Sequence, residues 1–227
     1  MVRFFHVARS FPGADVLTDV HLTIERGEIA LVSGPAGSGK TTLARLVLGL
    51  DTPRRGWITV DGVVLGGSSS RVLAAHRRRV AVIAQGPLLV GDRSALDNVA
   101  LALEVAGVGP AEARRRSAVV LERLGQARLA ANEVWTLSRG ERQWIAIARA
   151  LVRADAPLLV ADEPAEGLGD AESIVVGSLL AEEQRAGRTV VVLSRAASLS
   201  GAGEVRRFDL RGGRTEEVEA ALCRRAS

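Results

Sequence analysis

The segment at residues 34–41 limits the possible folds of this chain more than any other. It has the pattern Gly-x-x-x-x-Gly-Lys-Thr, and a short apolar run at residues 28–33 precedes it. Apolar residues recur at helical spacing after it, so a helix is expected to begin inside the loop. Such a loop directs backbone N–H groups and the partial positive charge of a helix N-terminus at one point. The segment therefore predicts a phosphate-binding loop between a buried strand and a helix.

The side chains of this loop suit a nucleoside triphosphate with Mg²⁺. Lys40 is expected to reach the β- and γ-phosphates, and the Thr41 hydroxyl is expected to ligate the metal. Lys40 is the only lysine among 30 Lys and Arg residues, so the single compact ammonium stands where such a loop requires one. The predicted nucleotide-binding residues are Gly34, Pro35, Ala36, Gly37, Ser38, Gly39, Lys40, Thr41 and Thr42.

Strands and helices alternate along most of the chain, which predicts an α/β fold with a mostly parallel sheet. Residues 92–136 show helical periodicity without a strand, which indicates an inserted helical subdomain. We therefore expect one domain, with a core lobe at residues 1–88 and 137–227 and a helical subdomain at residues 89–136. The other expected elements are strands at 2–7, 16–24, 80–84, 157–161 and 189–193, a hairpin at 57–65, helices at 94–105, 110–124, 141–151 and 171–185, and a strand, a Gly212-Gly213 turn and a terminal helix within 204–227.

The composition excludes several classes of protein. The chain has 227 residues, of which 47% are hydrophobic and 25% charged, as in an ordinary globular protein with a full core. Cys223 is the only cysteine, so no disulfide can form within the chain. No segment reaches the roughly 20 apolar residues of a membrane span, and the N-terminus lacks a signal-peptide pattern. We therefore expect a cytoplasmic protein that reaches the membrane only through a partner.

The arginines are scattered along the chain instead of forming one basic patch. Short runs occur at residues 54–55, 77–79 and 114–116. A nucleic-acid-binding protein concentrates positive charge on one face, so we expect no nucleic-acid partner. A solvated surface explains the runs best, and contact with anionic lipid or with an acidic partner at the membrane is the alternative.

Two acids follow a buried strand in the second half of the chain. Four apolar residues at 158–161 precede Asp162 and Glu163. Hydrolysis of a nucleotide needs a carboxylate for the metal and a base for the attacking water. Asp162 is therefore a candidate Mg²⁺ ligand, and Glu163 is a candidate general base. The alternative is that both acids only cap the next helix.

The order of these motifs resembles the ATP-binding-cassette (ABC) ATPases over essentially the whole chain. The phosphate loop is followed by Gln85 after a strand, by Leu-Ser-Arg-Gly-Glu at residues 137–141, and by Asp-Glu-Pro at residues 162–164. The resemblance implies a P-loop core with an antiparallel N-terminal β subdomain and a helical subdomain. It also implies ATP hydrolysis and a head-to-tail homodimer, with each ATP between the phosphate loop of one subunit and the Leu-Ser-x-Gly-Glu segment of the other.

Further site residues follow from the resemblance alone. Ser138 and Gly140 would contact the γ-phosphate from the opposite subunit. Gln85 would touch Mg²⁺ and sense a membrane partner. Phe11 would stack on adenine, although a core phenylalanine is the alternative for it. The apolar residues at 88–90 are candidates to line a groove for a helix of the partner, with internal packing as the alternative.

Three positions depart from the family pattern. Arg139 replaces the first glycine of the Leu-Ser-Gly-Gly segment, and Gly169 stands where an aspartate is expected. Arg195 replaces the histidine that contacts the γ-phosphate after the last core strand. Arginine is always charged and longer than histidine. Arg195 could donate to the γ-phosphate as a catalytic residue, or it could point away and leave a slow enzyme.

Segments outside these motifs resemble one branch of the family most. Residues 1–7, 91–100 and 102–105 resemble the ATPases of bacterial cell-division complexes, and next those of lipoprotein release and macrolide export. The cell-division resemblance implies a membrane partner with four spanning helices and a location on the cytoplasmic face of the membrane.

Other functions stay open at this point. The alternatives are a transporter ATPase and a scaffold that binds ATP with little or no hydrolysis. A soluble DNA-repair or translation protein of the family is disfavoured because the chain holds one cassette with about 45 inserted residues. A P-loop kinase would have no role for Gln85 or the Leu-Ser-Arg-Gly-Glu segment.

Overall fold

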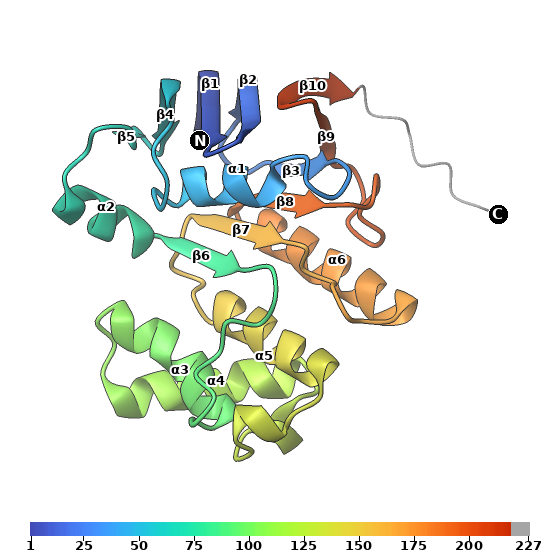
Figure 1. Cartoon of the computed structure of the whole chain (residues 1–227). Helices are drawn as coiled ribbons and strands as arrows, with labels where there is room; N and C mark the ends of the chain where they lie inside the picture. The colour runs from blue at the N-terminus through green and yellow to red at the C-terminus, as the bar shows by residue number, and fades with distance from the viewer. Residues whose placement is uncertain (219–227) are drawn as a thin grey trace.

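The computed structural model describes residues 1–218 and contains one sheet of ten strands with helices around it (Figure 1). The strand order is β5-β4-β1-β2-β10-β9-β3-β8-β7-β6. The strands are β1 (Val2–Phe11), β2 (Ala14–Ile24), β3 (Ile29–Ser33), β4 (Arg55–Val60), β5 (Val63–Val64), β6 (Val80–Ile83), β7 (Leu158–Asp162), β8 (Thr189–Ser194), β9 (Arg206–Arg211) and β10 (Arg214–Val218).

The core half of the sheet is parallel. Strand β3 pairs in parallel with β8 and β9, and β7 pairs in parallel with β8 and β6. Every residue of β3 and β7 is buried, because helices cover both faces of a parallel sheet and leave it no polar face. This burial explains why the apolar runs at residues 28–33 and 157–161 predicted these strands well.

The N-terminal half of the sheet is antiparallel. Strand β1 pairs with both β2 and β4, and β4 forms the hairpin with β5 through Asp61 and Gly62, which both have positive φ. The register of β1 shifts between Phe4 and Val7 and again beyond it. These bulges interrupt the alternation of apolar residues, and for this reason the sequence prediction ended β1 four residues too early. The α/β fold with an antiparallel N-terminal part is confirmed.

The helices are α1 (Lys40–Val47), α2 (Ser70–Arg77), α3 (Ala95–Val105), α4 (Pro110–Arg123), α5 (Arg139–Leu151) and α6 (Asp170–Arg185). Helix α2 was not predicted, because only His76 of its residues is buried and its sequence carries no apolar stripe. Helix α5 begins two residues before the predicted start, because Ser138 and Glu141 form a capping box. Among the described residues, none of these helices is long and apolar enough to cross a membrane.

Three buried clusters hold the molecule together. The first joins the antiparallel strands, α1 and one face of the parallel strands, and the second lies on the other face of those strands under α5 and α6. The third lies among α3, α4 and α5, which gather beyond the edge strand β6 (Figure 1). Its members lie between Ala95 and Val152, so these helices bury a core of their own.

The C-terminal segment differs from the prediction. Strand β9 and the turn at Gly212 and Gly213 are present, but strand β10 follows the turn where the terminal helix was expected to begin. Strand β10 inserts between β9 and β2 and joins the two halves of the sheet. The remaining part of the predicted terminal helix, residues 219–227, lies outside the described residues.

Candidate nucleotide-binding site

The phosphate-binding loop connects β3 to α1 at the carboxyl end of the parallel strands. Gly39 stands just before α1 with φ of 103°, and a Cβ there would lie 2.7 Å from Leu17 Cδ2. A side chain is therefore excluded at Gly39 by both backbone conformation and space. At Gly34, a Cβ would lie 2.4 Å from the carbonyl oxygen of Leu210. The two glycines let the loop pass close to its neighbours on either side.

Lys40 is buried and folds back over its own loop. Its Nζ donates to the carbonyl oxygens of Gly34 and Pro35, at 2.8 and 3.0 Å. The ammonium is 3.8 Å from a carboxylate oxygen of Glu163. The loop backbone therefore helps to hold the Lys40 ammonium in position.

A pocket of 340 Å³ opens beside this loop and brings most of the predicted residues together. Its wall includes Gln85, Glu163 and Arg195, which come from three segments far apart in the sequence. Gly34 and Pro35 line an adjoining cavity that also reaches Arg195, and Ser38 has a buried hydroxyl without a hydrogen-bond partner among the described residues. The loop residues that line the main pocket are Ala36, Gly37, Gly39, Lys40, Thr41 and Thr42.

Thr41, Gln85 and Asp162 supply oxygen atoms suited to a hard cation. The Thr41 hydroxyl donates to Gln85 Oε1 at 3.1 Å. Asp162 ends β7, and its Oδ1 is buried without a hydrogen-bond partner within the described part of the chain. Burial raises the pKa of Asp162, while the nearby Thr41 hydroxyl lowers it. A buried carboxylate oxygen without a partner, next to a hydroxyl and an amide oxygen, is the donor set that Mg²⁺ prefers.

Glu163 is held in a strained and highly charged position. Its φ of 49° lies in the left-handed region, which only a few per cent of non-glycine residues adopt. Its backbone N–H donates to the Leu193 carbonyl oxygen at 2.8 Å, and its Oε2 accepts from the Arg195 N–H at 3.2 Å. The side chain of Arg195 places Nε 3.4 Å from Glu163 Oε1. The carboxylate thus lies between the cations of Lys40 and Arg195.

Glu166 connects two of the three departures from the family pattern. Its Oε1 lies 2.9 Å from Arg139 Nη2 and 3.7 Å from Arg195 Nη2. Arg139 also packs over Gly167, where a Cβ would lie 3.1 Å from its Nε. Sequence reasoning missed Glu166, because an acid three residues after Glu163 carries no motif of its own. Alternating charges therefore run from Lys40 through Glu163, Arg195 and Glu166 to Arg139.

Three of the predicted residues lie away from this pocket within one chain. The hydroxyl of Ser138 accepts from the Glu141 N–H at 3.3 Å, and Gly140 follows inside α5. Phe11 is exposed at the turn between β1 and β2, with the Arg9 guanidinium 4.7 Å from its ring centre. None of these residues lines the nucleotide pocket.

The segment after Gln85 is tied to the helical cluster by Asn98. The buried Asn98 accepts from the Val90 N–H at 2.7 Å and donates to the Val90 carbonyl oxygen at 3.0 Å. Leu89 packs against the cluster of α3, α4 and α5, whereas Leu88 is 70% exposed. Internal packing therefore accounts for Leu89 but not for Leu88. Sequence reasoning missed Asn98, since a single asparagine in an apolar helix signals no particular partner.

Comparison with known proteins adds the following similarities. The family profile described as ABC transporter matches residues 17–166. The cell division ATP-binding protein FtsE of Escherichia coli is 36% identical over 200 residues, which span 88% of this chain and 90% of FtsE. The lipoprotein-releasing system ATP-binding protein LolD of Bacteroides thetaiotaomicron is 33% identical over 202 residues, which span 88% of this chain and 92% of LolD.

A solved structure is also similar over nearly its full length. The ATP-binding cassette MJ0796, determined as a dimer in a post-hydrolysis state with ADP and Pi, superposes with a TM-score of 0.88 at 29% identity. The match covers 96% of this chain and 98% of that one. The segment that matches the family profile contains the phosphate loop, Gln85 and both acids, whereas Arg195 lies beyond it.

Proposed function

The chain belongs to the ABC transporter family, and from that premise we propose that it is an ATP-hydrolysing subunit of a membrane complex. The observation that carries the proposal is the pocket beside the phosphate loop, because it joins Lys40, Gln85 and Glu163 around one space. A bound Mg²⁺ would neutralise phosphate charge there. Thr41, Gln85 and Asp162 are the residues that would hold it.

In this proposal each residue of the pocket has a separate role in hydrolysis. The loop N–H groups and Lys40 bind the β- and γ-phosphates. Glu163 takes a proton from the attacking water, because its carboxylate faces the pocket next to the lysine. ATP must first draw Lys40 and Arg195 toward its phosphates, which frees Glu163 from its two ion pairs. Arg195 then donates to the γ-phosphate from the position where the family has a histidine, and we expect slow turnover.

The remaining predicted residues act across a homodimer in this proposal. Ser138 and Gly140 lie away from the pocket of their own chain, so they suit contact with an ATP held by a second copy. Phe11 is exposed at a turn, where adenine would stack on its ring beside or in place of the Arg9 guanidinium. The dimeric state of the similar cassette MJ0796 supports this arrangement.

The hydrolysis proposal is tested by phosphate release from the wild-type protein, two site variants and one control variant. We expect Lys40→Ala and Glu163→Gln each to lose about 10²-fold or more in turnover, because one removes phosphate binding and the other removes the base. Glu163→Gln should still bind ATP, whereas Lys40→Ala should bind it weakly. Glu122→Gln is the matched control, since Glu122 is exposed on α4.

Equal phosphate release from all of these proteins would contradict the assignment of Lys40 and Glu163. If wild-type protein instead keeps bound ATP intact for hours with Mg²⁺ present, the nucleotide-dependent scaffold becomes the better description.

The specific role that we propose is that of FtsE in cell division. The similarity to FtsE supports it, and the similarity to LolD keeps a lipoprotein-release or export ATPase as the second candidate. The cell-division role predicts an FtsX-like integral membrane partner. This chain would then lie on the cytoplasmic face of the membrane, where ATP cycling of the dimer drives the partner.

The surface that would meet this partner includes the exposed Leu88 and Val90. Both follow Gln85 and are anchored to the helical cluster through Asn98 and Arg149, whose Nη1 donates to the Leu88 carbonyl oxygen. We propose that residues 89–136 act as a helical subdomain which moves with this segment, while residues 1–88 and 137–227 form the core lobe. A movement of Gln85 on nucleotide binding would thereby be transmitted to the membrane partner.

Capture of the tagged protein from detergent-solubilised membranes of its own host tests the partner. We expect a single partner with four membrane spans, released by Leu88→Asp, because a charge there cannot enter an apolar interface. Val64→Asp is a matched control, since Val64 is also an exposed aliphatic residue but lies on β5. A partner with six or more spans would favour the transporter.

A further inference from the structure

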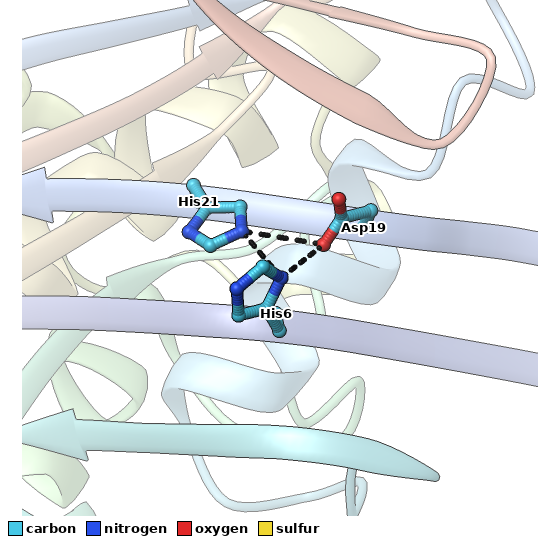
Figure 2. A group of neighbouring side chains, drawn as sticks. All are labelled: His6, Asp19 and His21. Atoms are coloured by element: carbon cyan, nitrogen blue, oxygen red, sulfur yellow. Dashed lines mark hydrogen bonds and ion pairs between the residues drawn. The ribbon is translucent and has the colours of Figure 1, made fainter.

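Two of the three histidines of the chain meet on the antiparallel half of the sheet, outside the nucleotide pocket. His6 lies on β1, and His21 and Asp19 lie on β2 (Figure 2). Both imidazoles are exposed, and Asp19 is partly exposed. None of the three residues has a part in the proposed hydrolysis, so the cluster needs another explanation.

The backbone of both strands is shaped to direct these side chains at one point. Asp19 and His21 are two residues apart on β2 and therefore project from the same face of the sheet. His6 has φ of 50° and sits where the register of β1 against β2 shifts between Phe4 and Val7. A non-glycine residue with positive φ is uncommon in a strand, although histidine, like asparagine and aspartate, adopts this conformation more readily than other residues. The bulge turns the ring of His6 toward Asp19 and His21.

The three donor atoms form a small triangle, as the dashed lines in Figure 2 show. His6 Nδ1 is 3.0 Å from Asp19 Oδ1 and 2.7 Å from His21 Nε2. His21 Nε2 is 3.3 Å from Asp19 Oδ1. Tetrahedral ligands that bind Zn²⁺ at 2.0–2.1 Å are about 3.3 Å apart. The three separations are thus equal to or shorter than the spacing of ligands around one zinc ion, and the two imidazole nitrogens would have to move apart by about 0.6 Å to admit it.

Hydrogen bonds alone cannot satisfy all three of these donor atoms well. Neutral imidazole has one N–H and one acceptor nitrogen, and an ionised carboxylate only accepts. One proton placed between His6 Nδ1 and His21 Nε2 leaves Asp19 with at best a divided hydrogen bond. A divalent cation, by contrast, accepts lone pairs from all three atoms at once.

Neighbouring groups fix the orientation of the two imidazoles. The ring of Phe5 stands edge-on to His6 and His21, with centroids 4.6 and 5.5 Å away, and stacks on Trp57 at 5.2 Å. The backbone of His21 is bonded to β10, because its N–H donates to Thr215 Oγ1 at 3.2 Å and its carbonyl accepts from the same hydroxyl. These contacts limit how far the two side chains can move away from Asp19.

We propose that His6 Nδ1, Asp19 Oδ1 and His21 Nε2 bind a divalent transition-metal ion of the zinc class, with a fourth position open to water. Two imidazoles and one carboxylate are ligands that suit Zn²⁺. The ion links β1 to β2 next to β10, so it stabilises the antiparallel half of the sheet, which also carries Phe11. The site is distinct from the oxygen-lined Mg²⁺ site at Thr41 and Asp162.

The test measures metal binding to the full chain after removal of any histidine tag, in the Cys223→Ser background and with excess Mg²⁺. Cys223 lies outside the described residues, and its replacement removes a thiolate that could bind zinc elsewhere. Titration calorimetry with Zn²⁺ and visible absorption with Co²⁺ are the two readouts. We expect one ion per chain and the strong visible bands of tetrahedral Co²⁺, together with a rise in Tm on adding Zn²⁺.

Substitution of the ligands distinguishes this site from others. His21→Gln and Asp19→Asn should each weaken Zn²⁺ binding by about tenfold or more and remove the Co²⁺ bands. Asp15→Asn is the matched control, because Asp15 is an exposed carboxylate on the same strand. All variants should keep the circular dichroism spectrum of the parent protein. Absence of Zn²⁺ binding by the parent protein, or equal binding by the ligand variants and Asp15→Asn, would overturn the proposal.

Discussion

Arg195 stands where the family resemblance predicts a histidine. Its guanidinium pairs with Glu163 and Glu166, and its backbone N–H also donates to Glu163. The side chain is 55% exposed, so water screens these ion pairs and each contributes little to stability. We expect these ion pairs to affect activity instead. Glu163 is the proposed base, and pairing with Arg195 makes its carboxylate less able to accept a proton from water.

Replacing this arginine with the histidine of the family tests that consequence. We expect Arg195→His to leave ATP turnover unchanged or to raise it, since Glu163 loses an ion pair while a donor to the γ-phosphate remains. Phosphate release under saturating ATP measures the effect, with Arg71→His as a control at an exposed arginine on α2. A collapse of turnover in Arg195→His would instead show that histidine cannot replace Arg195 in catalysis.

The buried carboxylate of Asp162 lowers the stability of the folded protein by an amount that depends on pH. Burial raises its pKa in the folded protein, so ionisation at neutral pH favours the unfolded chain. Asp162→Asn removes this cost, and we expect Tm at pH 7 without Mg²⁺ to rise. The gain should vanish as the pH falls below ~3.9, where aspartate is protonated in both states.

Thermal unfolding of both proteins across this pH range measures the difference. The same variant should lose the stabilisation that Mg²⁺ and ATP give to the wild-type protein. A lower Tm for Asp162→Asn at neutral pH without Mg²⁺ would contradict the assigned cost.

Helix α6 depends on a glycine for its packing. Gly177 lies in the buried face of the helix, and a Cβ there would lie 1.8 Å from the carbonyl oxygen of Ser200. The backbone must move to admit a methyl group, so we expect Gly177→Ala to lower the free energy of unfolding by about 1–3 kcal/mol or more. Chemical denaturation measures it. Gly109→Ala is the control, since Gly109 has φ of −61° and a Cβ at this position would have no atom within 4 Å.

Which elements could be predicted depends on where their side chains are buried. Strands β3 and β7 are buried at every residue and stood out as apolar runs, whereas α2 buries only His76 and β10 is polar throughout its exposed face. Lys40 and Glu163 could be predicted because nucleotide hydrolysis requires particular residue types at particular places, whereas Gln85 was predicted from the family resemblance alone. The roles of Glu166 and Asn98 come from contacts between segments that are far apart in the sequence. No local sequence pattern predicts such contacts.

At the scale of the whole molecule, the proposal requires two copies of the chain. Hydrolysis limits the lifetime of an ATP-bound dimer, so a variant without the base should accumulate it. We expect Glu163→Gln to sediment as a dimer with ATP and Mg²⁺ and as a monomer with ADP. Ser138→Ala added to Glu163→Gln should weaken this dimer, because the hydroxyl is placed to meet the second ATP. A monomer under all conditions would count against the shared sites.

The solitary lysine gives the whole molecule an unusual chemical property. Lys40 carries the only side-chain amine of the chain, and the N-terminal amine donates to the Ile24 carbonyl oxygen at 2.6 Å in a partly buried position. An amine-selective acylating reagent therefore has a single side-chain amine to modify, which lies in the pocket wall where a bound nucleotide would cover it. The extent of acylation, read by mass spectrometry, becomes a direct gauge of nucleotide occupancy in the unlabelled wild-type protein, even inside an intact membrane complex.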